Sequence, residues 1–240
     1  MRIFTLPNAI TSMNLLCGIL GVICTLRGLP PGIAFGLMLA AAVFDFFDGM
    51  AARLLHSTSP IGKELDSLSD MVSFGVLPAL MLVRCMEYGY GESWLCLLPL
   101  VLAVLSGYRL AKFNVDERQS TDFIGVPTPA AAVIAGSFAC CTLTLPAAAA
   151  LAATPWFLPL FSLLLGLLLV SEIPMFSIKV AKGHKLLDAK HLVFLGLSVA
   201  ALLAGGVWQK NGALALLLVF VLYILENLVL FGLSRCKDRR

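Results

Sequence analysis

Long apolar stretches alternate with short groups of proline, glycine and charged residues along the whole chain. Most stretches have about 20 residues or more, the length that an α-helix needs to cross the hydrocarbon core of a bilayer. Prolines at their boundaries, among them Pro30-Pro31 and Pro127, are typical of helix starts, where a missing N–H costs nothing. The pattern predicts eight helices, at residues 8–27, 31–55, 64–86, 92–113, 128–151, 156–178, 190–208 and 212–233.

The composition supports a membrane protein. Of the 240 residues, 60% are hydrophobic and 13% are charged, and the mean hydropathy is +0.95. A soluble domain is closer to half apolar and a quarter charged. These values exclude a disordered chain and favour an all-α polytopic membrane protein over a water-soluble enzyme. The net charge of +3 is too small to indicate a nucleic-acid partner.

Basic residues are divided unequally between the two ends of the predicted helices. With eight helices both termini lie on one side, and all but three of the 17 lysines and arginines fall there. The opposite side carries Arg27, Arg84 and Lys210. The positive-inside rule therefore predicts cytoplasmic termini in a multi-pass protein of the plasma or inner membrane. The lysines of residues 179–190 and the tail from Arg235 are predicted to lie against anionic headgroups of the bilayer.

Four aspartates gather at the predicted cytoplasmic ends of the second and third helices. Asp45 and Asp48 are three residues apart, and Asp66 and Asp70 are four apart, so each pair shares one helix face. A short connection joins the two helices, so the two faces can meet. Converging carboxylates near a membrane need a positive partner, and oxygen ligands suit Mg²⁺ or Mn²⁺. The pattern predicts a site for one or two of these metal ions at these four aspartates.

The spacing around these aspartates is itself a signature: Asp45-x2-Asp48-Gly49-x2-Ala52-Arg53-x8-Gly62-x3-Asp66-x3-Asp70. It resembles the signature of the CDP-alcohol phosphotransferase family at every fixed position. The resemblance implies a six-helix catalytic core in residues 1–180. Two additional helices and a basic tail would occupy residues 181–240.

The fixed residues also make physical sense as a CDP site. Gly49 and Ala52 have almost no side chain, so a flat cytidine or a pyrophosphate can approach the helix backbone. Arg53 offers a fork of donors suited to phosphate. Gly62 is expected to let the connection turn beside the metal site. Asn8 and Thr11 share a face of the first helix and resemble the family's nucleotide-side motif, although a helix cap and interfacial polar residues explain them too. The predicted CDP-binding set is Asn8, Thr11, Asp48, Gly49, Ala52, Arg53 and Gly62.

Three further stretches, residues 66–75, 108–115 and 123–130, resemble the integral-membrane phosphatidylserine synthases, and residues 171–177 add weaker support. This resemblance implies transfer of a phosphatidyl group from CDP-diacylglycerol to L-serine with release of CMP. Asp70 resembles the family's general base. Arg109 and Lys112, three residues apart, are cations available for the serine carboxylate, and anchoring at the membrane surface is the alternative.

Other interpretations stay open. The acceptor alcohol could instead be glycerol phosphate, inositol phosphate or choline, although a phosphorylated acceptor would want more cations near the site. A cation transporter is the alternative of a different class, but it would place its acids near the bilayer centre. The sequence leaves open the oligomeric state, with a homodimer as one alternative, the choice between Mg²⁺ and Mn²⁺, and the role of the last two helices.

Overall fold

The computed structural model of the protein describes residues 5–57, 59–116, 123–175 and 211–238. The prediction of an all-α polytopic membrane protein is confirmed. In the described residues five helical runs are long and apolar enough to cross a bilayer, or six if one sharply bent pair is a single span. The predicted helix at 190–208 lies outside the described residues.

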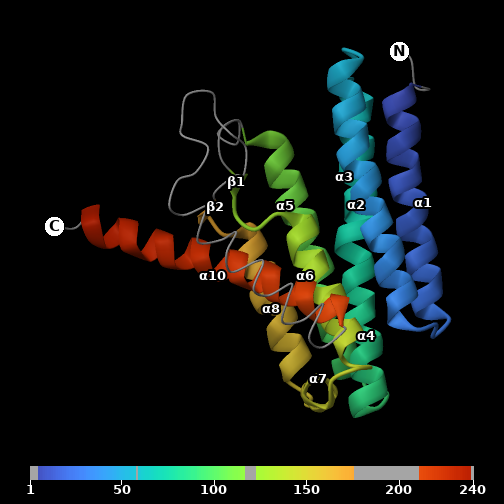
Figure 1. The fold of residues 1–240 in the computed structure, drawn as a ribbon, viewed down its shortest axis with the longest axis vertical. Coiled ribbons are helices and arrows are strands. Elements are labelled where there is room, and N and C mark those ends of the chain that lie inside the picture. Colours follow the sequence, from blue (N-terminus) through green and yellow to red (C-terminus); the bar gives the residue numbers. More distant parts are fainter. Residues whose placement is uncertain (1–4, 58, 117–122, 176–210, 239–240) are drawn as a thin grey trace.

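The first two helices form an antiparallel pair joined by a tight turn. Helix α1 (Leu6–Leu26) packs along most of α2 (Pro31–Leu54). Figure 1 shows α1 leaving the N-terminal end of the molecule and α2 returning to it. Gly28 makes the turn possible because its φ of 71° is a conformation that side chains with a Cβ rarely adopt.

The third predicted helix is longer than the sequence suggested. Helix α3 (Pro60–Asp70) begins four residues before the predicted start because Ser59 caps it and Pro60 occupies its first position. It continues through a π-helical segment, Met71–Val76, into α4 (Leu77–Tyr90). The wider π turn accommodates Pro78, which has no N–H to donate to the preceding turn. The connection after α2 is correspondingly shorter than the eight residues expected.

The next two predicted helices are less regular than expected. The helix expected at 92–113 consists of a short 3₁₀ segment, Trp94–Leu100, which leads into α5 (Val101–Val115). The single helix expected at 128–151 is wrong, because α6 (Thr128–Cys141) and α7 (Pro146–Ala152) are bent by 109°. Pro146 explains the break, since it disfavours helical backbone in the residue before it.

The helix expected at 156–178 also stops early. Helix α8 (Phe157–Val170) gives way to a two-residue strand, β2 (Pro174–Met175), which pairs antiparallel with β1 (Phe123–Ile124). The last described helix, α10 (Gly212–Asp238), packs mainly on α6. Figure 1 shows α10 running across the helices it meets rather than along them.

The core is centred on α6, which is buried along nearly its whole length. Small residues make this possible, because alanine and glycine let helix backbones approach closely. A Cβ on Gly136 would lie 2.7 Å from both Phe35 and Met38 of α2. The helices around α6 are therefore held close together.

Candidate active site

Three carboxylates from two helices come together near the start of α1. Asp45 and Asp48 lie on α2 and Asp66 lies on α3. One carboxylate oxygen of each residue lies within 4.8 Å of those of the other two. Asp48 is buried, and the other two are half-buried. The i, i+3 spacing on α2 puts both of its acids on one face, the one from which they reach Asp66.

The surroundings of these carboxylates fit a divalent metal ion. Asp48 Oδ2 and Asp66 Oδ1 are buried, and neither accepts a hydrogen bond within the described part of the chain. Leaving a buried acceptor without a partner costs about 1–3 kcal/mol, and three neighbouring carboxylates also repel one another. A hard divalent cation offsets both penalties because it prefers carboxylate oxygens as ligands.

Close packing of α1 against the helical run that carries Asp66 and Asp70 holds the site together. The hydroxyl of Ser73 donates a hydrogen bond to the carbonyl oxygen of Asn14 at 3.1 Å. Gly18, one turn later on α1, faces the same serine so closely that a Cβ there would overlap its hydroxyl. Because Gly18 has no Cβ, α1 can pack closely enough to place Asn8, Thr11 and Asn14 near the acids.

All seven residues predicted to bind CDP line one cleft, whose volume is about 260 Å³. The metal-site residues Asp48 and Asp66 form part of its wall, so the acids and the cleft are one site. The structure adds four further lining residues, namely Pro7, Ser57, Ser59 and Lys63.

The glycines of this cleft have different roles. A Cβ at Gly49 would meet no atom within 4 Å, so the α2 backbone is open to the cleft, as expected. Gly62 does not turn the connection, which is a correction to the expectation, because it lies in the first turn of α3. A Cβ at Gly62 would lie 3.0 Å from Asn8 Oδ1, so the glycine makes room for α1. Arg53 donates from Nε to the carbonyl oxygen of Gly49 at 2.9 Å, and this bond holds the guanidinium at the cleft.

Asp70 lies one turn beyond Asp66 and outside the group of three carboxylates. Its Oδ1 accepts a hydrogen bond from Asn14 Nδ2 at 3.3 Å. Asn14 is fully buried on α1. Asp70 thus has a neutral hydrogen-bond donor as its partner, and it is not one of the three acids whose oxygens lie within 4.8 Å of one another.

The two cations predicted to bind serine have different environments. Arg109 is only 8% exposed, and its Nη1 donates to Thr128 Oγ1 at 3.1 Å. Its guanidinium lies over the ring of Phe113, with 5.1 Å between Cζ and the ring centroid. Lys112 is more exposed and pairs with Glu172 at 3.5 Å. Anchoring at the membrane surface requires an exposed cation, so it suits Lys112 and does not suit Arg109.

Comparison with known proteins agrees with this geometry. A family model described as CDP-alcohol phosphatidyltransferase matches residues 4–168, which include every residue of the site. The chain belongs to the CDP-alcohol phosphatidyltransferase family. Together with the long apolar helices, this membership establishes a multi-pass membrane protein.

Several curated proteins named CDP-diacylglycerol–serine O-phosphatidyltransferase are similar to this chain. The protein of Mycobacterium leprae is 32% identical over 84% of this chain and 66% of its own length. That of Helicobacter pylori strain 26695 is 32% identical over 81% of both chains. That of Bacillus subtilis is 35% identical over 52% of this chain and 69% of its own. The chain spans somewhat less than two thirds of the mycobacterial relatives that it matches.

Six residues of this CDP-alcohol phosphatidyltransferase site were missed from the sequence, namely Pro7, Asn14, Ser57, Ser59, Lys63 and Thr128. Asn14 continues the three-residue spacing of Asn8 and Thr11, and that polar stripe on an apolar helix was the available signal. Lys63 follows Gly62 directly, but it was counted only as a basic residue of the membrane surface. Thr128 lies in the stretch 123–130 that resembles the synthases, but nothing in the sequence pairs it with Arg109, because that contact joins α6 to α5.

Proposed function

We propose that this protein transfers the phosphatidyl group of CDP-diacylglycerol to the hydroxyl of L-serine, which produces phosphatidylserine and CMP. One observation carries the proposal: two of the three carboxylates that fit a metal ion, Asp48 and Asp66, line the cleft that holds the whole predicted CDP-binding set. The names of the relatives support serine as the acceptor. The chemistry also suits the site, because phosphoryl transfer depends on positioning and charge neutralisation.

The reaction needs a base, and Asp70 is the proposed one. Its carboxylate accepts the proton of the serine hydroxyl while the serine oxygen forms a bond to the β-phosphorus. The bond from that phosphorus to the CMP oxygen breaks, and CMP leaves. The hydrogen bond from Asn14 holds the Asp70 carboxylate in place for this transfer.

The other charged residues bind and orient the two substrates. Asp45, Asp48 and Asp66, with Asp70 beside them, would hold one or two divalent cations, Mg²⁺ or Mn²⁺, which would supply positive charge against the pyrophosphate oxygens. Arg53 holds a phosphate from the cleft side. Arg109 holds the serine carboxylate, since its guanidinium is buried beside Thr128 and its planar fork can hold a carboxylate through two hydrogen bonds.

The proposed orientation follows from the basic residues. The acidic group lies at the same end as the start of α1 and the end of α2, where the excess of lysine and arginine predicts the cytoplasm. Serine and CDP would arrive there from water while the acyl chains stay in the lipid. In the proposed organisation, residues 1–180 form the catalytic core and residues 181–240 add two helices and a basic tail.

The direct test is release of CMP from CDP-diacylglycerol by the purified full chain. Serine, glycerol phosphate, inositol phosphate and choline are supplied in parallel as acceptors, with hydrolysis in the absence of acceptor as the baseline. Serine is expected to give the fastest release. Faster release with another alcohol would overturn the acceptor, and no release above baseline with any alcohol would overturn the transferase itself.

Asp70→Asn is expected to lower turnover by about 10²–10⁴-fold, the usual contribution of a general base. Asparagine keeps the shape of the side chain but cannot take a proton at this position. Mn²⁺ binding, followed by electron paramagnetic resonance, and CDP-diacylglycerol binding should stay close to wild type. If Asp70→Asn lost Mn²⁺ as completely as Asp48→Asn, ligation would be its main role and the base would lie elsewhere.

Arg109→Lys is expected to raise the KM for serine about tenfold or more, because hydrogen bonds to charged groups contribute about 1.5–3 kcal/mol and lysine lacks the planar fork. The affinity for CDP-diacylglycerol should barely change. Serine is titrated at saturating CDP-diacylglycerol, with Lys112→Ala as the matched control on the same helix. An unchanged serine KM for Arg109→Lys would remove this residue from the serine site.

A further inference from the structure

A second pocket lies at the opposite end of the helices from the acidic group. Its volume is about 280 Å³, and its lining comes from the α1–α2 turn, from α4 and from the residues that follow α6. Thr25 of α1 lines it, whereas Thr11 of the same helix lines the catalytic cleft. At a helical rise of 1.5 Å per residue, these two threonines are about 21 Å apart. The second pocket is therefore separated from the catalytic cleft by most of the thickness of a bilayer core.

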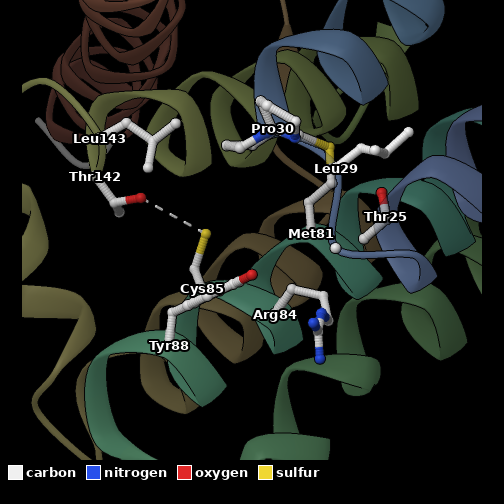
Figure 2. Close-up of a pocket in the computed structure, with 11 residues that line it drawn as sticks. Thr25, Leu29, Pro30, Met81, Arg84, Cys85, Tyr88, Thr142 and Leu143 are labelled. Atoms are coloured by element: carbon white, nitrogen blue, oxygen red, sulfur yellow. Dashed lines mark hydrogen bonds between the residues drawn. The ribbon is translucent and has the colours of Figure 1, made fainter.

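The walls of this pocket are mostly apolar. Leu29, Pro31, Met81 and Leu143 contribute hydrophobic surface. Figure 2 shows Thr142 facing Cys85, a pair whose oxygen and sulfur atoms lie 3.8 Å apart. Both threonine hydroxyls of the lining donate to backbone carbonyls within their own helical turns, so the polar groups of these walls are satisfied internally. Such walls suit a hydrocarbon chain.

One end of the pocket carries an arginine, Arg84, that is paired with Glu87. Figure 2 shows Arg84 and Tyr88 at the end away from Pro30 and Leu143. Arg84 Nη1 donates to Glu87, and the guanidinium lies over the ring of Tyr88 with 5.4 Å between Cζ and the ring centroid. Its Nε is buried and has no acceptor within the described residues.

At the same end, Arg84 and Tyr88 present hydrogen-bond donors to the α1–α2 turn. A Cβ on Gly28 would lie 3.4 Å from Arg84 Nη2 and 3.5 Å from the Tyr88 hydroxyl. The guanidinium and the phenol therefore meet beside the α1–α2 turn, and the glycine leaves space in front of them. An anionic oxygen placed in that space can accept from both groups, and guanidinium suits phosphate oxygens.

We propose that this pocket binds a bilayer phospholipid of the leaflet opposite the active site, with its phosphodiester at Arg84 and Tyr88 and an acyl chain along Met81 and Leu143. The position at the ends of membrane-spanning helices places Arg84 at the depth of the phosphate groups. The apolar walls and the donors of Arg84 and Tyr88 at one end match the two halves of such a lipid. This lipid is a ligand and not a substrate, because the acidic group lies across the membrane.

The test is native mass spectrometry of the purified, delipidated full chain titrated with 1-palmitoyl-2-oleoyl phosphatidylglycerol. Arg84→Gln removes the charge, and it is expected to weaken binding of one lipid per chain by about 10- to 100-fold. Arg27→Gln is the matched control, since it removes the same charge from an exposed residue at the same end of the protein and outside the pocket. A second variant, Leu29→Trp, places bulk at the pocket and keeps Arg84, so it should also reduce occupancy.

The diacylglycerol with the same acyl chains provides the chemical control, because it lacks only the phosphodiester and headgroup. It is expected to bind at least about tenfold more weakly than the phospholipid, since it cannot accept from Arg84. Equal binding of the two lipids would overturn the proposal. Equal loss in Arg84→Gln and Arg27→Gln would also overturn it, as would unchanged binding in both Arg84→Gln and Leu29→Trp.

Discussion

Replacing Asp48 or Asp66 with asparagine is expected to abolish CMP release while the protein still inserts and folds. Each substitution keeps the volume of the side chain and removes one of the three charges that lie within 4.8 Å of one another. Bound metal stabilises developing charge by several kcal/mol, and each 1.4 kcal/mol is tenfold in rate, so a loss of about 10³-fold or more is expected. Because the same oxygens hold the cation, Mn²⁺ affinity should fall together with turnover.

Glu64→Gln provides the matched control for these two variants. Glu64 is an exposed acid on α3, two residues before Asp66, and it lines neither the metal group nor the cleft. The substitution removes one negative charge from the same helix, so it reports the effect of net charge alone. Its turnover should stay within about twofold of wild type, as is usual for surface substitutions. Near-normal activity of Asp48→Asn or Asp66→Asn would mean that the metal ligands are misassigned.

Removing divalent cations is expected to stop turnover completely and reversibly. The acids of the site outnumber the cations beside them, and two of their oxygens are buried without hydrogen-bond donors in the described structure. CMP release is measured in excess chelator and again after Mg²⁺ or Mn²⁺ is added back, with circular dichroism as the check on folding. Full turnover in excess chelator would contradict a metal-dependent site.

A second readout of the same site does not depend on activity. An ion that binds only the folded protein raises the melting temperature as its concentration increases. Added Mn²⁺ should therefore stabilise the wild-type protein and Glu64→Gln, and it should have much less effect on Asp48→Asn. Equal stabilisation of all three would indicate that the cation binds outside the acidic group.

Much of the active site was readable from the sequence because its elements are local. Helical geometry alone puts residues three or four apart on one face, so the pairs Asp45 with Asp48 and Asp66 with Asp70 needed no tertiary information. The spacing between the pairs then predicted that the two faces meet, and Asp66 does join Asp45 and Asp48 in the structure. The lengths of the apolar stretches likewise predicted membrane-spanning helices, because a helix needs about 20 apolar residues to cross the bilayer core.

The tertiary structure alone decided which partner each polar side chain finds. How far each helix is rotated about its axis and shifted along it depends on packing, and this placed Asp70 against Asn14 and buried Arg109 against Thr128. The second pocket had no sequence signal, because its lining comes from segments that are fifty residues or more apart and that only the packed bundle brings together. Arg84 appeared in the sequence as one of three basic residues on the sparse side of the membrane. Only the arrangement of α1, α4 and α6 gave its guanidinium a pocket to face.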